Sequence, residues 1–262
     1  MNKEVAIITG GTAGIGREVC LSIAKKGVKV VVAGRNSERG NEVVKQIQEA
    51  GGEALFVSTN VGTEKDVKEL VDKTLNEYGR IDFLFNNAGT EGVLGPLETN
   101  TEEVIDEVLS ANIKGVILCI KHILPEMVKQ ERGVIINTAS FVGTTTPLPI
   151  AVVYGASKSA VLSITQSVAA SCEDKNVKVY SVCPWVTDTP MADRLTGHDA
   201  EAKAAFGANI NPSGEIVPAS EIADVVLALF AGENIIKSGE AILVDKGKST
   251  SQILPMSIAK NE

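Results

Sequence analysis

The sequence predicts an α/β fold in which a doubly wound sheet of seven parallel strands forms a single domain over residues 1–262. Short, nearly all-apolar runs alternate with longer amphipathic segments, and a glycine-rich turn follows the first apolar run. Strands that are buried on both faces of a parallel sheet show such unbroken apolar runs. Hydrophobic residues make up 44% of the chain and charged residues 22%, which excludes a disordered or collagen-like chain.

The apolar runs define the predicted strands. They are Val5–Ile8, Val28–Ala33, Ala54–Ser58, Ile81–Asn86, Val134–Thr138, Val177–Cys183 and Ala241–Val244. Helices between them are predicted from apolar residues that recur at helical spacing, and one helix begins near Arg17. The other predicted helices include Glu38–Ala50, Lys65–Tyr78, Thr101–Gln130 and Tyr154–Asp174.

Two longer segments interrupt this alternation. Residues 139–153 form a loop with several threonines and prolines, and residues 190–219 are rich in alanine, glycine and proline. Both follow the carboxyl ends of strands, where open α/β sheets bind ligands, so residues 190–219 are predicted to form a small substrate lid. Residues 249–262 show no clear pattern and are expected to be a C-terminal tail.

Charge and cysteine content exclude several classes of protein. With 25 basic and 33 acidic residues, the chain has a net charge of −8 and lacks the basic surface that binds nucleic acid. Its four cysteines and two histidines have no metal-site spacing, so no metal is expected and the thiols are expected to be free. With no signal-like segment and no run of about 18 apolar residues, we expect no membrane span and a cytoplasmic location.

The first turn indicates a phosphate-binding loop. Thr9–Gly16 lies between the first strand and the first helix, and glycines there permit a tight turn close to a pyrophosphate. The unpaired N–H groups of the following helix would attract that anion. The alternative is an ordinary glycine-rich turn, but the required strand before the loop and helix after it are both predicted.

The end of the second predicted strand indicates the cofactor. In enzymes that bind NAD, an acidic residue at this point hydrogen-bonds the ribose hydroxyl, whereas here Gly34 and Arg35 follow the strand and the first carboxylate is Glu38. A guanidinium pairs well with a 2′-phosphate. The sequence therefore favours NADP(H) over NAD(H), and the alternative is that Arg35 is a solvated surface residue.

Tyr154 and Lys158 are the strongest catalytic candidates. Residues four apart share a helix face, so the phenol and the ammonium group are expected to point into the same space. A nearby cation favours the phenolate and brings the pKa of a tyrosine toward the working range of an acid/base group. Ser140, just after the strand Val134–Thr138, could donate a hydrogen bond to a substrate carbonyl.

Together these motifs resemble those of the short-chain dehydrogenases/reductases along essentially the whole chain. Thr9–Gly16 matches the T-G-x-x-x-G-x-G motif of that family, Asn86–Gly89 matches N-N-A-G, and Asn112 stands at the position of the catalytic asparagine. The resemblance implies a single extended Rossmann domain in which Tyr154 is the acid/base and Lys158 lowers its pKa and binds ribose.

The resemblance also implies that Ser140 orients the carbonyl and that Asn112 anchors a proton-relay water. The alternatives are that Asn112 caps a helix and that Ser140 is a turn residue. Trp185 stands where the family usually has glycine, and it could form a wall of the substrate pocket or pack in the core. Asn60 replaces the usual aspartate beside adenine, and its amide oxygen can still accept that hydrogen bond.

The resemblance assigns each candidate residue to a part of the site. The predicted cofactor-binding residues are Gly10, Thr12, Gly14, Ile15, Gly16, Arg35, Asn60, Val61, Asn87, Ala88, Gly89, Tyr154, Lys158, Pro184, Thr187 and Thr189. The predicted substrate pocket includes Ser140, Trp185 and Met191, with Leu148, Ile150 and Phe206 as further apolar candidates.

These inferences predict an oxidoreductase that transfers a hydride between NADP(H) and a small-molecule carbonyl or secondary alcohol, in the manner of a ketoreductase. The alternatives are an NAD-dependent alcohol dehydrogenase of the same fold and a non-catalytic NADP(H)-binding sensor or assembly subunit. Members of the family commonly form tetramers through the helices predicted at Thr101–Gln130 and Tyr154–Asp174, so a homotetramer is expected.

Overall fold

The computed structural model describes residues 4–144, 146–233 and 236–252. All its strands lie in one sheet with the order β3-β2-β1-β4-β5-β6-β7-β8, in which β1 to β7 are parallel and β8 is antiparallel to β7. The strands are β1 (Val5–Thr9), β2 (Lys29–Gly34), β3 (Ala54–Ser58), β4 (Phe83–Asn86), β5 (Gly133–Thr138), β6 (Val177–Pro184), β7 (Ala241–Asp245) and β8 (Lys248–Gln252).

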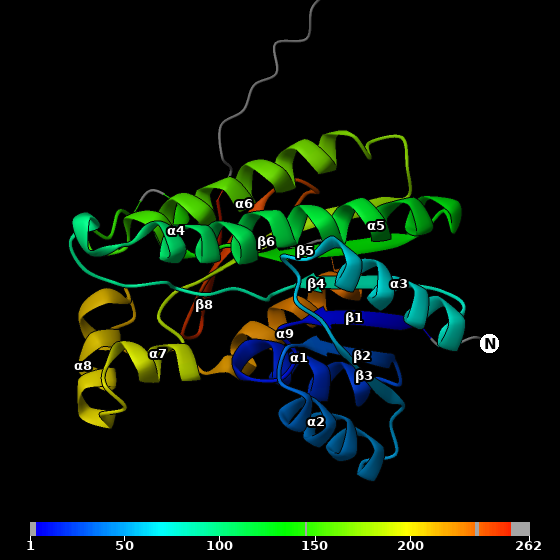
Figure 1. Ribbon diagram of the computed structural model, residues 1–262, viewed down its shortest axis with the longest axis horizontal. Coiled ribbons are helices and arrows are strands. Elements are labelled where there is room, and N and C mark those ends of the chain that lie inside the picture. Colours follow the sequence, from blue (N-terminus) through cyan, green and yellow to red (C-terminus); the bar gives the residue numbers. More distant parts are fainter. Residues whose placement is uncertain (1–3, 145, 234–235, 253–262) are drawn as a thin grey trace, which may run out of the picture.

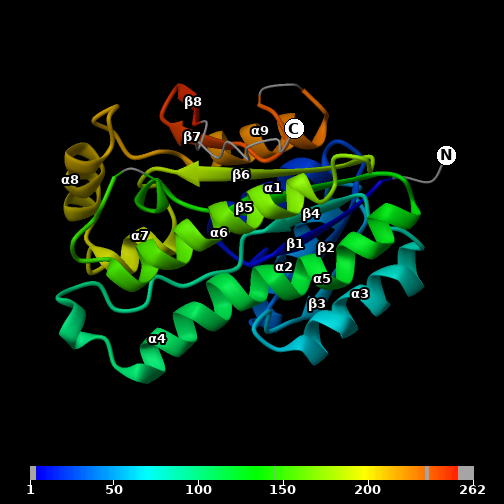
Figure 2. The ribbon, with the colours of Figure 1, turned by 90° about the horizontal axis from the view of Figure 1, so that it is seen from above.

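Helices cover both faces of this sheet (Figure 1). They are α1 (Gly14–Ala24), α2 (Ser37–Glu49), α3 (Glu64–Tyr78), α4 (Glu102–Leu109), α5 (Gly115–Lys129), α6 (Val152–Ala170), α7 (Pro190–Leu195), α8 (Ala200–Ile210) and α9 (Ala219–Phe230). One face carries α1, α2 and α9, and the other carries α3, α5 and α6, with α4 and α6 side by side (Figure 2). The predicted parallel α/β sheet is confirmed, and each predicted strand is present with bounds shifted by at most two residues.

The eighth strand was not predicted, and it occupies the start of the segment that the sequence analysis assigned to a tail. Gly247, with a φ of +63°, lies in the short turn after β7, and β8 then runs back along β7 with Val244 opposite Ser249. The segment lacks an apolar run because it forms an edge strand, so the periodicity of the sequence did not indicate it. The rest of the predicted tail, residues 253–262, lies outside the described residues.

Alternate residues of the central strands pack on opposite faces, and this produces two aliphatic core layers. Ile7 and Leu84 belong to the layer under α3, α5 and α6, whereas Ile8 and Phe85 belong to the layer under α1, α2 and α9. Phe83 contacts Phe230 of α9 with ring centroids 4.6 Å apart. The four cysteines are buried and free, as expected.

A buried chain of polar side chains runs across the strands on the face of the sheet that α6 covers. Asn86 Nδ2 donates to Asn137 Oδ1 (2.9 Å), and Asn137 Nδ2 donates to Thr165 Oγ1 (2.9 Å). Thr165 Oγ1 also shares a hydrogen bond with Ser181 Oγ at 2.7 Å. This chain links β4, β5, α6 and β6, and therefore ties α6, the helix that carries Tyr154 and Lys158, to the three strands beneath it.

The helix predicted at Thr101–Gln130 contains a π-helical turn, Ser110–Lys114, between α4 and α5. Taken together, Glu102–Lys129 is long and apolar enough to cross a membrane by length and composition, and the sequence analysis did not anticipate this. Its buried side chains, such as Ile120, Ile123 and Met127, pack against the sheet. A core helix passes the same length and composition test, and the packing of these side chains accounts for part of the apolar character of this helix.

The predicted lid, residues 190–219, contains the helices α7 and α8 and reaches the first residue of α9. Asn211 holds the base of the lid: its Oδ1 accepts from the backbone N–H of Val186, and its Nδ2 donates to the carbonyls of Val186 and Glu215. A parallel β-bridge between Thr187 and Val217 also joins the segment before the lid to the end of the lid. The lid is therefore anchored to the segment that follows β6.

Candidate active site

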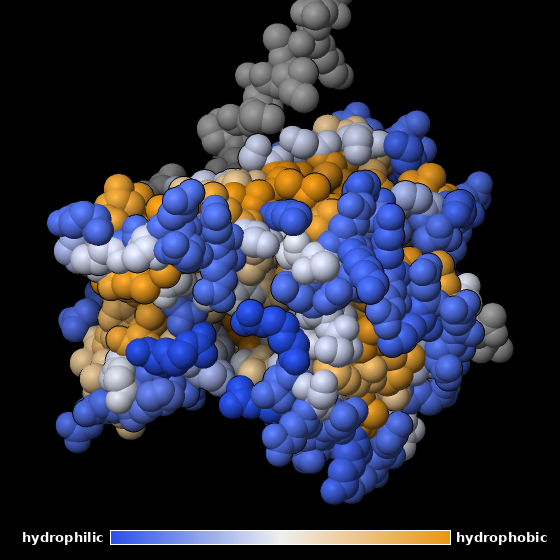
Figure 3. Space-filling view, viewed as in Figure 1, coloured by the Kyte–Doolittle hydropathy of each residue, from blue (hydrophilic) through white to orange (hydrophobic). Residues whose placement is uncertain are grey.

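A cavity of about 430 Å³ lies at the carboxyl ends of the central strands, between the glycine loop, the loop after β4, the start of α6 and the lid. Figure 3 shows the hollow on this face, with hydrophilic side chains around its mouth. Ligand sites of this fold class lie at this edge of the sheet, and pockets for small molecules have comparable volumes. Of the residues predicted to bind cofactor or substrate or to catalyse, all but Gly16, Asn112 and the further apolar candidate Ile150 line this cavity.

The glycine loop approaches the loop after β4 closely. A Cβ on Gly10, whose φ is +66°, would lie 2.9 Å from the Cα of Ala88, and a Cβ on Gly16 would lie 2.4 Å from the carbonyl oxygen of Gly10. Gly16 thus allows α1 to pack behind the loop rather than lining the cavity itself. α1 begins at Gly14, not near Arg17 as predicted, so the last residues of the glycine loop already belong to the first turn of the helix.

The segment Asn86–Gly89 is hydrogen-bonded to this loop through Thr9. Thr9 Oγ1 accepts from the backbone N–H groups of Asn87 (3.0 Å) and Ala88 (3.1 Å), and Asn87 Nδ2 donates to the carbonyl of Thr9 (3.3 Å). The two loops therefore form one rigid wall of the cavity. The glycines and these hydrogen bonds together leave room for a backbone-bound pyrophosphate beside the N-terminus of α1.

The far end of this wall carries two arginines. Arg35 is exposed, and its Nη1 lies 3.9 Å from Glu107 Oε1 on α4. Arg39 lines the same part of the cavity from the first turn of α2, a helix capped by Asn36. Arg39 was not predicted from the sequence, although its position four residues after Arg35, at the start of the next helix, could have indicated a second cation. The side-chain oxygen of Asn60 accepts from the N–H of Gly62 at 3.1 Å.

Tyr154, Lys158 and Ser140 meet on the opposite wall. The Tyr154 hydroxyl is hydrogen-bonded to Ser140. Lys158 Nζ donates to the carbonyl of Thr138 at 2.7 Å and lies 5.5 Å from the centre of the Tyr154 ring. Ser140 Oγ also accepts from the N–H of Val142, so it serves as a turn residue as well as facing the phenol.

Burial controls the pKa values of both groups. It raises the pKa of Tyr154 to about 12, opposed by the hydrogen bond from Ser140. It also lowers the pKa of Lys158 to about 8. The net direction for the phenol is opposite to the lowering predicted from its spacing to Lys158, because burial outweighs the influence of a lysine whose own charge is disfavoured.

Asn112 lies inside the helix Glu102–Lys129, within its π-helical turn, and does not cap a helix. Its Oδ1 accepts from the N–H of Thr90 (2.9 Å), and its Nδ2 donates to the carbonyl of Thr90 and to Ser157 Oγ (both 2.9 Å). Asn112 therefore joins the loop after β4 to α6 just behind the cavity. Single π-helical turns are frequent at functional sites because they displace the side chains that follow.

The cavity beyond Tyr154 is walled by apolar side chains. Trp185 stacks on Phe141 with ring centroids 4.5 Å apart and an interplanar angle of 14°, so it forms a wall rather than packing wholly in the core. Met191 and Phe206 of the lid face the same space. Ile150, a further apolar candidate, does not line the cavity and is 43% exposed.

An ion pair that the sequence did not indicate also borders the cavity. Arg194 on α7 donates from Nε to Glu91 Oε1 (2.8 Å) and from Nη2 to Glu91 Oε2 (3.0 Å). The two residues are 103 positions apart, and neither belongs to a recognisable motif. Only the folded chain brings them together. Among the described residues, no cluster of side chains has the composition of a metal site.

The comparisons with known proteins agree with this geometry. Residues 4–200 match the family model described as short chain dehydrogenase. The chain belongs to the short chain dehydrogenase family. Among the relatives of this short chain dehydrogenase, a cyclopentanol dehydrogenase of Comamonas sp. is 32% identical over 94% of this chain and 97% of its own. A 3-oxoacyl-[acyl-carrier-protein] reductase of Thermotoga maritima is 34% identical over 94% of this chain and 98% of its own.

Solved structures of other short chain dehydrogenases show the same architecture. Levodione reductase superposes with a TM-score of 0.87 at 31% identity, covering 93% of this chain and 96% of its own. Actinorhodin polyketide ketoreductase with NADPH gives a TM-score of 0.87 at 30% identity, covering 94% of this chain and 97% of its own. The chain is thus an oxidoreductase of a family that binds nicotinamide cofactors, and these relatives include both ketoreductases and alcohol dehydrogenases.

The residues of this cavity fit such a cofactor. A side chain at Gly10 or Gly16 would clash with the loop after β4 or with the backbone of Gly10, so these glycines keep the two loops that border the cavity close together. Thr138 Oγ1, on a residue that lines the cavity, is buried and has no hydrogen-bond partner among the described residues. A ligand that carries hydroxyl groups would supply that missing partner.

Proposed function

We propose that this short chain dehydrogenase reduces ketones with NADPH, and oxidises the corresponding secondary alcohols in the reverse direction. The observation that carries the proposal is the Tyr154 phenol, which is hydrogen-bonded to Ser140 on the cavity wall with Lys158 one helical turn away. Both hydroxyls can donate to one carbonyl oxygen from this arrangement. A non-catalytic sensor would not need a phenol with such partners.

The role of each residue follows from its place in the cavity. Ser140 and Tyr154 hold the carbonyl oxygen, and Tyr154 transfers its proton to that oxygen as the carbonyl carbon receives a hydride. When bound, the nicotinamide supplies that hydride. The ammonium of Lys158 stabilises the phenolate that remains, and its position beside Thr138 also places it to bind ribose hydroxyls. Asn112 positions the loop after β4 and supports a proton-relay water.

The direct test is Tyr154→Phe. We expect this variant to lose most of its NADPH oxidation with a panel of cyclic, aromatic and 3-oxoacyl ketones, while its NADPH dissociation constant, measured by fluorescence, stays within about twofold. Tyr78→Phe, which makes the same chemical change on α3 away from the cavity, serves as the control. Turnover that survives in Tyr154→Phe would refute the mechanism, and silence of the wild-type enzyme across the panel would favour a sensor.

The apolar walls support an apolar ketone as the substrate. Trp185 stacks on Phe141, and Met191, Leu148 and Phe206 add further apolar side chains to the cavity wall. Such a surface favours rings and planar groups over polyols, because sugar hydroxyls would lose hydrogen bonds to water without finding partners there. We therefore expect cyclic ketones to be better substrates in the panel than keto sugars.

The preference for NADP(H) rests on Arg35 and Arg39. Both line the end of the cavity where a 2′-phosphate would lie, and their guanidinium groups can pair with it. We expect Arg35→Ala to raise the KM for NADPH at least tenfold more than the KM for NADH, with Arg132→Ala on the distant surface as the control. Equal effects on the two cofactors would instead favour an NAD-dependent alcohol dehydrogenase.

The surface supports a homotetramer as its assembled form. Leu109, Ile117 and Val152, on the outer sides of α4, α5 and α6, are 37%, 46% and 47% exposed. Pairing of these helices between subunits would bury the apolar side chains. Light scattering should give a mass near four chains, and a stable monomer would refute the assembly. The buried free thiols also fit a reducing compartment, which supports a cytoplasmic location.

A further inference from the structure

The ion pair between Glu91 and Arg194 joins the lid to the floor of the cavity. Glu91 follows β4 and is only 8% exposed, whereas Arg194 lies in the last turn of α7. The two N–H···O contacts, at 2.8 and 3.0 Å, form a bidentate pair. Such a pair has defined geometry and is strong when one partner is buried.

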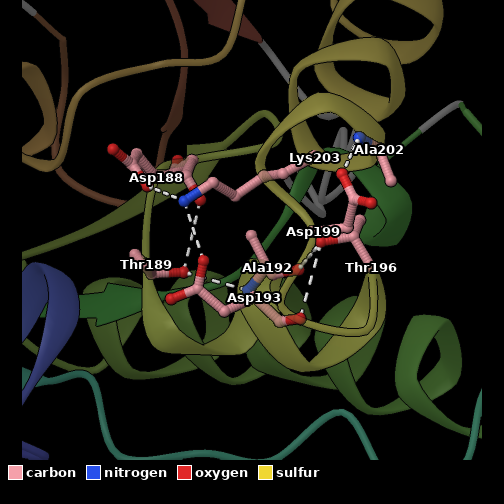
Figure 4. A network of polar contacts seen from close by, with 9 residues as sticks. Asp188, Thr189, Ala192, Asp193, Thr196, Asp199, Ala202 and Lys203 are labelled. Atoms are coloured by element: carbon pink, nitrogen blue, oxygen red, sulfur yellow. Dashed lines mark hydrogen bonds and ion pairs between the residues drawn. The ribbon is translucent and has the colours of Figure 1, made fainter.

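This pair is the polar tie that crosses the cavity. Among the described residues, the other side-chain hydrogen bonds of the lid run within the lid or to the segments at the ends of β6 and β7. Figure 4 shows Lys203 Nζ of α8 bound to Asp188 (2.6 Å) and Asp193 (2.7 Å), which fixes α8 to α7. Because α7 and α8 are tied together in this way, a movement of Arg194 away from Glu91 would carry the lid helices as a unit.

The same carboxylate acts on the phenol of Tyr154. The ionisable groups that face this phenol are Lys158 from α6, Cys183 from β6 and Glu91 from the loop after β4. The negative charge of Glu91 adds to burial in raising the pKa of Tyr154. This effect is present with the Glu91–Arg194 pair formed, and the positive charge of Arg194 can reduce it only while α7 rests on the loop.

We propose that Glu91 and Arg194 form a charge latch: when α7 closes onto the loop after β4, it shuts the cavity and simultaneously neutralises the carboxylate that faces the Tyr154 phenol. This inference rests on the proposed function, because it concerns the proposed acid/base residue. With the lid open, an unpaired Glu91 disfavours the phenolate. Closure weakens this effect, so the phenol is a better acid/base when the substrate is enclosed.

The first test measures the phenol without turnover. After a jump to pH 11, the ultraviolet absorbance of tyrosinate is read before unfolding, and the same protein with Tyr154→Phe is subtracted to remove the other two tyrosines. We expect Arg194→Met to decrease the Tyr154 tyrosinate several-fold relative to wild type. The double variant Glu91→Gln/Arg194→Met should return the amount of Tyr154 tyrosinate to the wild-type value or above, because it also lacks the carboxylate. A shift of one unit in the Tyr154 pKa changes the tyrosinate fraction at pH 11 by about fivefold or more.

The second test measures the lid by hydrogen exchange of residues 190–200. We expect exchange to be at least tenfold faster in Arg194→Met and in the double variant, since both lack the tie. Lys246→Met, which removes the ion pair of Lys246 with Glu215 at the base of the lid, is the matched control and should change neither readout.

A purely structural contact would not change the tyrosinate absorbance and the lid exchange independently of each other. The double variant should keep the fast lid exchange of Arg194→Met while losing its effect on tyrosinate. The proposal is overturned if Arg194→Met leaves either readout unchanged, if the double variant behaves like Arg194→Met in both, or if Lys246→Met reproduces the effects. Because neither measurement uses turnover, an enzyme inactive with every ketone would refute the proposed function and leave this test intact.

Discussion

The burial of Lys158 makes a prediction about stability that can be worked from the structure. Lys158 is 4% exposed, and burial lowers its pKa from 10.5 to about 8. Between these pH values the unfolded chain holds the lysine proton and the folded protein does not. The free energy of unfolding therefore rises with pH through this window, and the cost of burying the ammonium is fully present below pH 8. One pKa unit corresponds to about 1.4 kcal/mol, so the full contribution is about 3 kcal/mol.

Other buried groups titrate nearby with the opposite sign. Burial raises the pKa values of Cys20, Cys119, Cys183 and Tyr154, so each of these groups destabilises the folded protein as the pH rises above its unfolded value. The prediction therefore concerns the difference in the free energy of unfolding between Lys158→Met and wild type. We expect the stability of Lys158→Met relative to wild type to fall by about 3 kcal/mol between pH 7 and pH 10.5, since the other groups titrate in both proteins.

Urea unfolding followed by circular dichroism, at half-unit pH steps, measures this difference. Lys178→Met, at an exposed lysine on β6, controls for the loss of a positive charge. A stability difference between wild type and Lys158→Met that stays constant from pH 7 to pH 10.5 would show that the folded protein carries Lys158 as an ordinary lysine. That result would refute the reasoning, including the claim that burial weakens the influence of Lys158 on the phenol.

Two further predictions concern the loop and the buried polar chain. Gly16→Ala should weaken NADPH binding at least tenfold by fluorescence titration, because its Cβ would lie 2.4 Å from the carbonyl oxygen of Gly10; unchanged affinity would show that the loop can relax. Thr165→Val should lower the free energy of unfolding by about 1–3 kcal/mol, because it removes the buried partner of Asn137 Nδ2 and of Ser181 Oγ; a loss below about 0.5 kcal/mol in urea unfolding would contradict this.

The sequence predicted the elements of this site well where one short segment carries the chemistry. The spacing of Tyr154 and Lys158 on one helix, and the glycines between the first strand and helix, are local patterns that survive folding unchanged. The direction of the Tyr154 pKa shift was wrong, because it depends on how much of the protein surrounds the phenol. Arg39 was missed although it lies four residues after Arg35.

By itself, the sequence determined the parallel α/β sheet and indicated the glycine loop and the Tyr154–Lys158 pair as candidate parts of the site, because periodicity and motif spacing are properties of neighbouring residues. Only the tertiary structure decided that residues 248–252 form an edge strand and that Glu91 meets Arg194 across the cavity. Both are pairings between segments, whose partners are chosen by the way the whole chain packs. The position of the lid therefore depends on contacts between distant segments, such as Glu91 with Arg194, which local sequence patterns do not indicate.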